Sequence, residues 1–279
     1  MTAIGRWRQG LERWAIPPEI VAAAPKSPYG FPTELFRTRG ERANDRADPT
    51  PTTLRALEGL PEGGRVLDVG CGGGASSLPL AGRAGVLVGV DAQEDMLAGF
   101  LANAGAAGVE AEAVHGRWPD VADRVGPVDV AVAGHVLYNV ADLAPFAQRL
   151  ATVARSRVVY ELTERHPLHW MNDLWLRFHD VVRPDGPVAT DAREALAELD
   201  DDARMELWSA PQRGGGFDRR TDAVALIRRR LCLDPSHDDE LTEALGSRLV
   251  ERDGLWSAGP ADQRLATIRV ATSAGAGSS

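Results

Sequence analysis

Between residues 65 and 162, short apolar runs alternate with longer amphipathic stretches. Apolar runs of about four to eight residues bounded by turns are typical of buried strands, and longer stretches with a helical period are typical of helices. This alternation predicts a parallel sheet with helices on both faces. The expected strands are Arg65–Val69, Val86–Val90, Val109–Val114, Val128–Ala133 and Arg157–Leu162. The expected helices are Ser76–Arg83, Gln93–Ala104 and Ala141–Ala154, with a short turn near Pro119–Arg124.

The pattern after residue 162 is more helical, with two further strands. Met205–Ser209 alternates apolar and polar residues, and Leu265–Thr272 has the pattern of a strong final strand, so we place Leu207 and Ile268 in the last two strands. Four amphipathic segments between and before them predict helices: Leu168–Val182, Asp191–Leu199, Thr221–Cys232 and Asp238–Leu249. A glycine-rich connection is expected over Gln212–Phe217, and the small residues of 273–279 are typical of a disordered tail.

Residues 1–60 form an N-terminal helical extension in this interpretation. Trp7, Leu11 and Trp14 recur at helical spacing, a second helix follows the two prolines at 17 and 18, and Thr52–Leu60 predicts a third. Prolines and glycine make the segment 25–40 irregular. This segment either folds over a ligand as a lid or is a surface connection, and the sequence leaves both open.

Charge and cysteine content exclude some classes of function. The net charge is −9, with 31 basic and 40 acidic side chains, which argues against a nucleic-acid substrate without excluding one. The two cysteines, Cys71 and Cys232, form no C-x-x-C pair, so we expect neither a disulfide framework nor a metal site, and a reducing cytoplasm is the simplest location. The absence of a signal-like start and of any long apolar run predicts no association with a membrane.

The first predicted strand ends in a glycine-rich turn, Asp68-Val69-Gly70-Cys71-Gly72-Gly73-Gly74. Glycines at such a turn allow a ligand to lie directly on the main chain. The carboxylate of Asp68 would repel the pyrophosphate of a dinucleotide, but it suits a ligand with cationic groups and no phosphate, such as S-adenosylmethionine (SAM). The second strand ends in Asp91, at the distance expected for an acid that binds ribose hydroxyls.

These two spaced motifs, Asp68-x-Gly70-x-Gly72-x-Gly74 and Gly89-Val90-Asp91, resemble those of the class I SAM-dependent methyltransferases. The likeness runs from about Arg65 to Glu161, and the flanks are similar to uncharacterised actinobacterial methyltransferase-domain proteins. The resemblance implies an α/β fold: a Rossmann-like, seven-stranded, mostly parallel sheet with an antiparallel edge strand. The methyltransferase domain would then span 61–272, with helical insertions near 165–185 and 218–250.

The resemblance also implies where the cofactor would lie. The acid of the glycine turn would lie beside the methionine moiety, the loop after the third strand along the adenine, and the loop after the fourth strand nearest the sulfonium. Trp118 either stacks on the adenine or anchors the core, and both remain open. The candidate SAM-binding residues are Asp68, Gly70, Cys71, Gly72, Asp91, Ala92, Met96, Gly116, Arg117, Trp118, Gly134 and His135.

Candidate catalytic residues follow the fourth and fifth strands, because ligands of open α/β sheets bind at the carboxyl ends of strands. His135, Glu161 and His166 lie there and could serve as a base if the acceptor must lose a proton. The alternative is a polar loop leading into an amphipathic helix. A metal site is not expected, because His166 and His169 flank a proline and make a poor ligand pair.

The expected function is SAM-dependent methylation of a small molecule at an oxygen, nitrogen or carbon atom. One alternative is an RNA methyltransferase, for which the run Arg228-Arg229-Arg230 is the main support; a solvated helix end explains that run more simply. A second alternative is a protein that binds SAM without transferring methyl, and a third is a dehydrogenase, which Asp68 disfavours. The sequence does not indicate the oligomeric state.

Overall fold

The computed structural model describes residues 1–29, 48–200, 202–211, 216–252, 254–260 and 262–272. Seven strands form one sheet in the order β3-β2-β1-β4-β5-β9-β6. The five strands predicted between residues 65 and 162 are confirmed and are all parallel to one another. After β3 the chain crosses to the other half of the sheet and adds β4 beside β1, so the strand order reverses between β1 and β4. Sheets of this kind bind ligands at such a reversal. The bounds of the five parallel strands are β1 Gly64–Val69, β2 Ala84–Asp91, β3 Glu110–His115, β4 Val128–Gly134 and β5 Ala154–Thr163.

The last two predicted strands are also confirmed, as β6 (Arg204–Pro211) and β9 (Asp262–Ala271). Strand β9 is antiparallel to both β5 and β6. The reversed strand is therefore the inner one of the pair, and the edge strand β6 runs in the same direction as β1 to β5. This pairing places Thr267 of β9 directly between Glu161 of β5 and Glu206 of β6.

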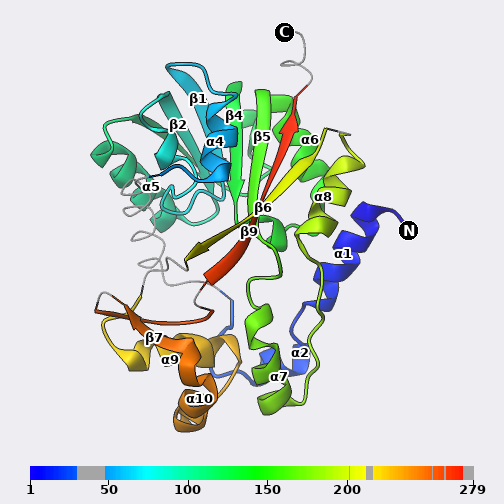
Figure 1. Cartoon of the computed structure of the whole chain (residues 1–279), viewed down its shortest axis with the longest axis vertical. Helices are drawn as coiled ribbons and strands as arrows, with labels where there is room; N and C mark the ends of the chain where they lie inside the picture. Colours follow the sequence, from blue (N-terminus) through cyan, green and yellow to red (C-terminus); the bar gives the residue numbers. More distant parts are fainter. Residues whose placement is uncertain (30–47, 201, 212–215, 253, 261, 273–279) are drawn as a thin grey trace.

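Helices cover both faces of the sheet (Figure 1). On one face, apolar side chains of α1, α6 and α8 share a core with the sheet, and on the other face those of α4 and α5 do. Trp7 of α1 is completely buried, and its indole N–H donates to the carbonyl of Val140 at 2.8 Å. The N-terminal helix is thus part of the main core. The bounds are α1 Ala3–Arg13, α4 Pro51–Leu57, α5 Glu94–Ala106, α6 Leu143–Val153 and α8 Ala189–Ala197.

A separate lobe lies below the sheet in Figure 1, and the chain enters it directly from β5. Its core is formed by apolar side chains of α7, α9, α10 and the hairpin β7–β8, with α2 packed against it. The hairpin was not predicted, although Asp253-Gly254 between two short apolar runs is a turn signal in the sequence. The bounds are α2 Pro18–Ala23, α7 Asn172–His179, α9 Arg220–Arg230, α10 Asp238–Leu245, β7 Leu249–Arg252 and β8 Leu255–Ala258.

The predicted helix Ser76–Arg83 is wrong. Only a 3-10 turn, Leu78–Leu80, lies between the glycine turn and β2. Pro79 has no N–H to donate, and β2 begins at Ala84, so too little chain remains for a regular helix. The predicted helix Leu168–Val182 is shorter than expected, because it starts with a 3-10 turn and ends at Asp180, whose φ of +52° is left-handed. The remaining 3-10 turns are Ala122–Arg124, Leu137–Asn139, His169–Met171, Pro235–His237 and Gly246–Arg248.

Several expectations concern residues outside the described ranges. Most of the segment 25–40, most of the glycine-rich connection 212–217 and the whole tail 273–279 fall there. The lid, the flexible connection and the disordered tail therefore stay predictions, as does the division of the chain into extension, domain and insertions.

Candidate active site

The glycine turn after β1 adopts left-handed backbone angles that favour glycine. Gly70, Gly72 and Gly74 have φ values of +69°, +51° and +89°. The N–H groups of Gly70 and Cys71 both donate to the carbonyl of Val90 in β2, at 2.8 and 3.1 Å. A Cβ on Gly70 would lie 2.3 Å from Cγ1 of Val136, so the turn lies directly against the loop that follows β4. The predicted cofactor segments are thus adjacent.

Asp91 ends β2 and binds the same turn. Its Oδ2 accepts a hydrogen bond from the N–H of Gly72 at 3.0 Å, and its Oδ1 accepts one from Gln93 at 2.9 Å. An ionised carboxylate has about four acceptor positions, so two ribose hydroxyls can still bind to it. The position and charge of this half-buried side chain fit the ribose of SAM.

Asp68 is the buried acid of the turn. Its side chain is only 1% exposed, and its Oδ2 accepts the hydroxyl proton of Ser77 at 2.6 Å. Burial raises its pKa to about 7, and the charge of Asp91 adds to the rise. A nearby ammonium group would favour the ionised form of Asp68, whereas a phosphate would be repelled. The Asp68 carboxylate therefore fits the ammonium group of SAM better than the pyrophosphate of a dinucleotide.

Cys71 contributes to the turn through its backbone. The thiol is buried, and a Cβ on Gly89 would lie 2.9 Å from its sulfur, so the side chain points into the core between the sheet and α5. Loss of solvation raises the pKa of the thiol well above its usual value. Cys71 and Cys232 are both free and buried, which agrees with the expectation that they form no disulfide.

The loop after β3 lies on the other side of Asp91. A ring nitrogen of His115 lies 3.1 Å from the carbonyl oxygen of Ala92, which joins the two loops. The indole N–H of Trp118 donates to the carbonyl of Phe146 in α6 at 3.1 Å, and its ring packs against the main core. These contacts favour the core anchor over adenine stacking. Among the other candidates, Met96 is buried, Gly116 is half-buried, and Ala92 and Arg117 are exposed.

His135 and Glu161 meet at the ends of two neighbouring strands. Nε2 of His135 lies 3.1 Å from Oε1 of Glu161, and the backbone N–H of His135 donates to the Glu161 carbonyl at 2.7 Å. The histidine has a φ of +59°, which is uncommon for a side chain of this size. Its side chain is 48% exposed and that of Glu161 is 16% exposed. The His135 imidazole is thus accessible to a ligand, while its Nε2 atom contacts the Glu161 carboxylate.

The pair lies beside the glycine turn. A Cβ on Gly134, the residue before His135, would lie 2.0 Å from the Oγ atom of Ser76. No side chain larger than hydrogen fits at position 134 without displacing Ser76. The structure therefore brings Gly134 and His135, both predicted site residues, next to the segment that follows the glycines.

Thr52 is a site residue that the sequence analysis missed. It lies in the first turn of α4, and its hydroxyl donates to Oε2 of Glu161 at 2.5 Å. Threonine near a helix start is common for capping alone, so no sequence signal distinguished it. Its partner is 109 residues away in the chain.

His166 has different surroundings. Its ring stacks on Trp14 with centroids 3.8 Å apart, and Tyr138 contacts it edge-on at 5.1 Å. Its Nδ1 accepts the N–H of Leu168 at 3.2 Å. Burial, together with the charge of Arg183, lowers its pKa to about 3, so the ring stays neutral at physiological pH. These contacts suit a packing role between α1 and the loop after β5.

The arginine run at the end of α9 is used within the lobe. Arg228 pairs with Asp238 at 2.6 Å. Arg229 donates to the carbonyl of Ser27 at 2.6 Å, and Arg230 donates to that of Pro28 at 2.7 Å. These contacts explain the basic run without a nucleic acid.

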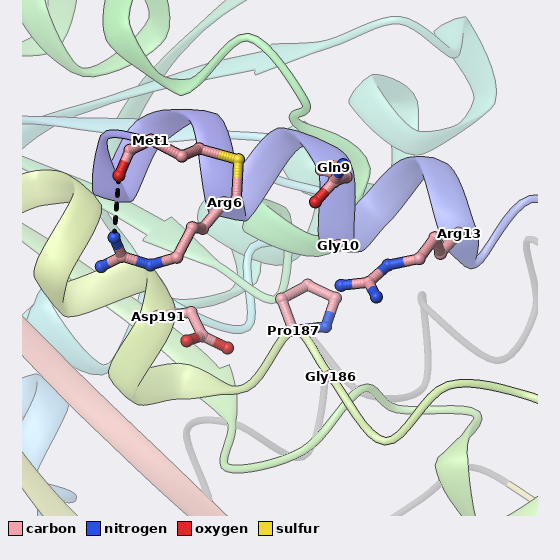
Figure 2. A pocket seen from close by; sticks show the side chains of 8 residues that line it. All are labelled: Met1, Arg6, Gln9, Gly10, Arg13, Gly186, Pro187 and Asp191. Carbon is pink, nitrogen blue, oxygen red and sulfur yellow. Dashed lines mark hydrogen bonds between the residues drawn. The ribbon is translucent and has the colours of Figure 1, made fainter.

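A small hollow lies between α1 and the loop before α8 (Figure 2). Arg6, Arg13 and Asp191 line it, and Pro187 packs against Gly10 at its base. None of the predicted site residues lines this hollow. Within the described ranges, no group of three or more metal-binding side chains is gathered, and no helix is long and apolar enough to cross a membrane.

Comparison with known proteins gives a consistent result. Residues 66–157 match the family model of a methyltransferase domain. The ubiquinone biosynthesis O-methyltransferase of Azorhizobium caulinodans is 38% identical over 97 residues, which cover 35% of this chain and 37% of that protein. The enzyme of the same description from Rhizobium leguminosarum bv. trifolii is 31% identical over 115 residues, or 41% and 44% of the two chains. The chain thus matches less than half the length of these two relatives.

Solved structures support the fold. A candidate methyltransferase of Bacillus halodurans C-125 superposes with a TM-score of 0.52 at 14% identity, covering 80% of this chain and 99% of that one. The YcgJ protein of Bacillus subtilis gives a TM-score of 0.50 at 16% identity, with 79% and 97% covered. The family match, the glycine turn and the strand order agree, and they identify the domain around residues 66–157 as a class I SAM-dependent methyltransferase domain.

Proposed function

We propose that the protein transfers a methyl group from SAM to an oxygen atom of a small-molecule acceptor, with His135 as the base and Glu161 as its supporting carboxylate. The observation that carries the proposal is the 3.1 Å contact between these two side chains, at adjacent strand ends beside the glycine turn. An exposed imidazole in contact with a half-buried carboxylate is an arrangement that suits general-base catalysis.

The cofactor would be held by the residues that form the turn and its neighbours. Asp68 would meet the ammonium group, Asp91 the ribose hydroxyls, and the backbone of Gly70 and Gly72 would lie along the ligand. SAM supplies an activated methyl group when bound, so the protein's main task is to position the acceptor.

Methyl transfer to oxygen also requires that the acceptor hydroxyl lose its proton. Because Nε2 of His135 faces Glu161, the other ring nitrogen, Nδ1, is the one that can take a proton from the acceptor. The imidazolium that forms would be stabilised by the adjacent Glu161 carboxylate. An acceptor nitrogen or carbon that carries no acidic proton would have no need of this pair, which supports oxygen.

The small-molecule assignment has two further supports. The net charge of −9 and the internal use of Arg228 to Arg230 leave RNA without a basic surface from that run. The curated relatives are described as O-methyltransferases of ubiquinone biosynthesis, which supports an oxygen acceptor without identifying it. Two buried free thiols fit the cytoplasmic location expected from the sequence.

Two experiments test the proposal. Calorimetric titration with S-adenosylhomocysteine (SAH), with NAD as the control, tests the cofactor: binding of SAH alone is expected, and binding of NAD alone would overturn the proposal. Release of SAH from SAM is then measured with a panel of phenols and other hydroxy compounds, and with total RNA. Turnover with a hydroxy compound supports the proposal. Tight SAH binding without turnover on the panel would favour a SAM-binding protein, and turnover only on RNA would favour the nucleic-acid alternative.

A further inference from the structure

A chain of hydrogen bonds runs from strand β6 to the candidate base. The indole N–H of Trp208 donates to Oγ1 of Thr267 at 3.0 Å. The hydroxyls of Thr267 and Thr52 are 2.7 Å apart. Thr52 then reaches Oε2 of Glu161 at 2.5 Å, and Oε1 of Glu161 lies 3.1 Å from His135. Four segments of the fold, β6, β9, α4 and β5, contribute one side chain each before the chain reaches the histidine.

The sheet register creates this chain. Glu161 and Thr267 are direct neighbours across β5 and β9, and α4 packs on the same two strands. Thr52 is 4% exposed and Thr267 is 1% exposed. Buried hydroxyls are costly unless they are hydrogen-bonded, so both are committed to the chain. The neighbouring carboxylate of Glu206 accepts instead from Arg55, at 2.7 Å.

The two ends of this hydrogen-bond chain determine which atom is the donor in every bond between them. The indole of Trp208 is a donor only, and an ionised Glu161 is an acceptor only. The hydroxyl of Thr52 must therefore donate its hydrogen bond to Glu161. The hydroxyl of Thr267 accepts a hydrogen bond from Trp208 and donates one to Thr52. In this arrangement every N–H and O–H has an acceptor, and all of them point toward the carboxylate.

We propose that Thr52, Thr267 and Trp208 are positioning residues that hold Glu161 as an oriented carboxylate and thereby select the Nε2–H tautomer of His135. With Oε2 occupied by Thr52, Oε1 is the oxygen that faces the imidazole, and it accepts a hydrogen bond from Nε2 only when Nε2 carries the ring proton. Nδ1 is then left as the lone-pair nitrogen directed to the acceptor. The catalytic meaning of this tautomer rests on the proposed function, but the tautomer itself does not.

The test is nitrogen NMR of the full-length protein labelled at its histidine rings, without ligand, at alkaline pH. The His135 signals are assigned by their loss in His135→Asn. The natural protein and the Thr52→Ser control, which keeps the hydroxyl, are expected to show one protonated and one unprotonated ring nitrogen, with Nε2 protonated. Thr52→Val has nearly the same shape without the hydroxyl, and its His135 is expected to show averaged signals from both tautomers.

Kinetics provide the second readout once an acceptor is known. Thr52→Val is expected to lower kcat by about tenfold, the effect of losing one hydrogen bond to a charged group, with SAH affinity unchanged. Thr52→Ser should restore most of it. If Thr52→Val does not fold, Trp208→Phe tests the far end of the chain by the same NMR measurement. A single Nε2–H tautomer in the variant without the hydroxyl or without the indole N–H would overturn the proposal. Absence of turnover in every variant would instead contradict the proposed function and leave the tautomer result intact.

Discussion

His135 is joined to Glu161 twice, once through its backbone N–H at 2.7 Å and once through its imidazole at 3.1 Å. The left-handed backbone of His135 turns the chain out of β4 while the first bond keeps it paired with β5. The two bonds together determine both where the ring starts and where it points. Each residue alone is an ordinary strand-end residue, and the two together make a pre-oriented imidazole, as the proposed base requires.

Replacement of His135 tests this base. His135→Asn is the appropriate change, because asparagine tolerates a φ of +59° better than most residues. We expect kcat to fall by about 100-fold or more, the usual contribution of a general base. SAH affinity, measured by calorimetry, should change little. An equal loss of SAH binding and of turnover would show that His135 mainly holds the cofactor.

The pH dependence of SAH binding tests Asp68. Its pKa is about 7 in the free protein, and an ammonium group beside it would lower that value. Binding therefore favours the ionised carboxylate. SAH affinity should rise as the pH increases through 7 and level off above it, with a slope that approaches tenfold per pH unit on the acidic side. In Asp68→Asn affinity should be weak and nearly independent of pH over this range. A flat profile in the natural protein would contradict the assignment.

The same carboxyl makes a prediction about stability. The folded-state pKa of about 7 exceeds the value of about 3.9 expected for the unfolded chain, so the folded protein holds the extra proton between these values. The free energy of unfolding should therefore decrease as the pH rises from about 4 to about 7, by on the order of 4 kcal/mol at most. Urea unfolding without ligand should find Asp68→Asn more stable than the natural protein at pH 8, with the difference shrinking toward pH 5. A stability difference independent of pH would contradict the buried, protonated acid.

Gly134 tests the contact between the two loops of the site. Gly134→Ala would place a Cβ 2.0 Å from Oγ of Ser76, so the segment after the glycine turn must move. We expect SAH affinity to fall by about tenfold or more. The double change with Ser76→Ala removes the clashing oxygen and should recover part of the loss, because the nearest remaining atom, Cβ of Ser76, is 3.2 Å away. Gly99→Ala in α5 is the matched control: nothing lies within 4 Å of its added Cβ, and binding should not change.

The strands and the glycine turn were predictable because their signals are local, whereas the cofactor roles of the turn residues stay predictions. Asp68, the three left-handed glycines and Asp91 lie within one strand–turn–strand unit, and the apolar runs around them mark the strands, whose arrangement in the sheet was implied by the family resemblance. The helix after the turn was mispredicted for a local reason too, since the apolar pattern of Leu78 and Leu80 outweighed Pro79.

The acceptor half was only partly predictable. His135 and Glu161 were candidates because both follow strands at the carboxyl edge, but their contact depends on the left-handed turn at His135, which the sequence does not indicate. His166 was a candidate for the same reason, and its stacking on Trp14 depends on where a distant helix packs. Thr52 and Thr267 carry no signal at all, because a threonine in a helix start or a strand is ordinary until the two elements meet.

The hydrogen bond between Thr52 and Thr267 joins residues 215 positions apart. During synthesis the glycine turn, Asp91 and the His135–Glu161 pair all leave the ribosome well before β9. Domains generally fold as units, however, and β9 contributes Ala266, Ile268 and Val270 to the main core. The site should therefore be completed only when β9 pairs with β5, so the ability to bind cofactor and the support of His135 should arise together, late in the synthesis of each molecule.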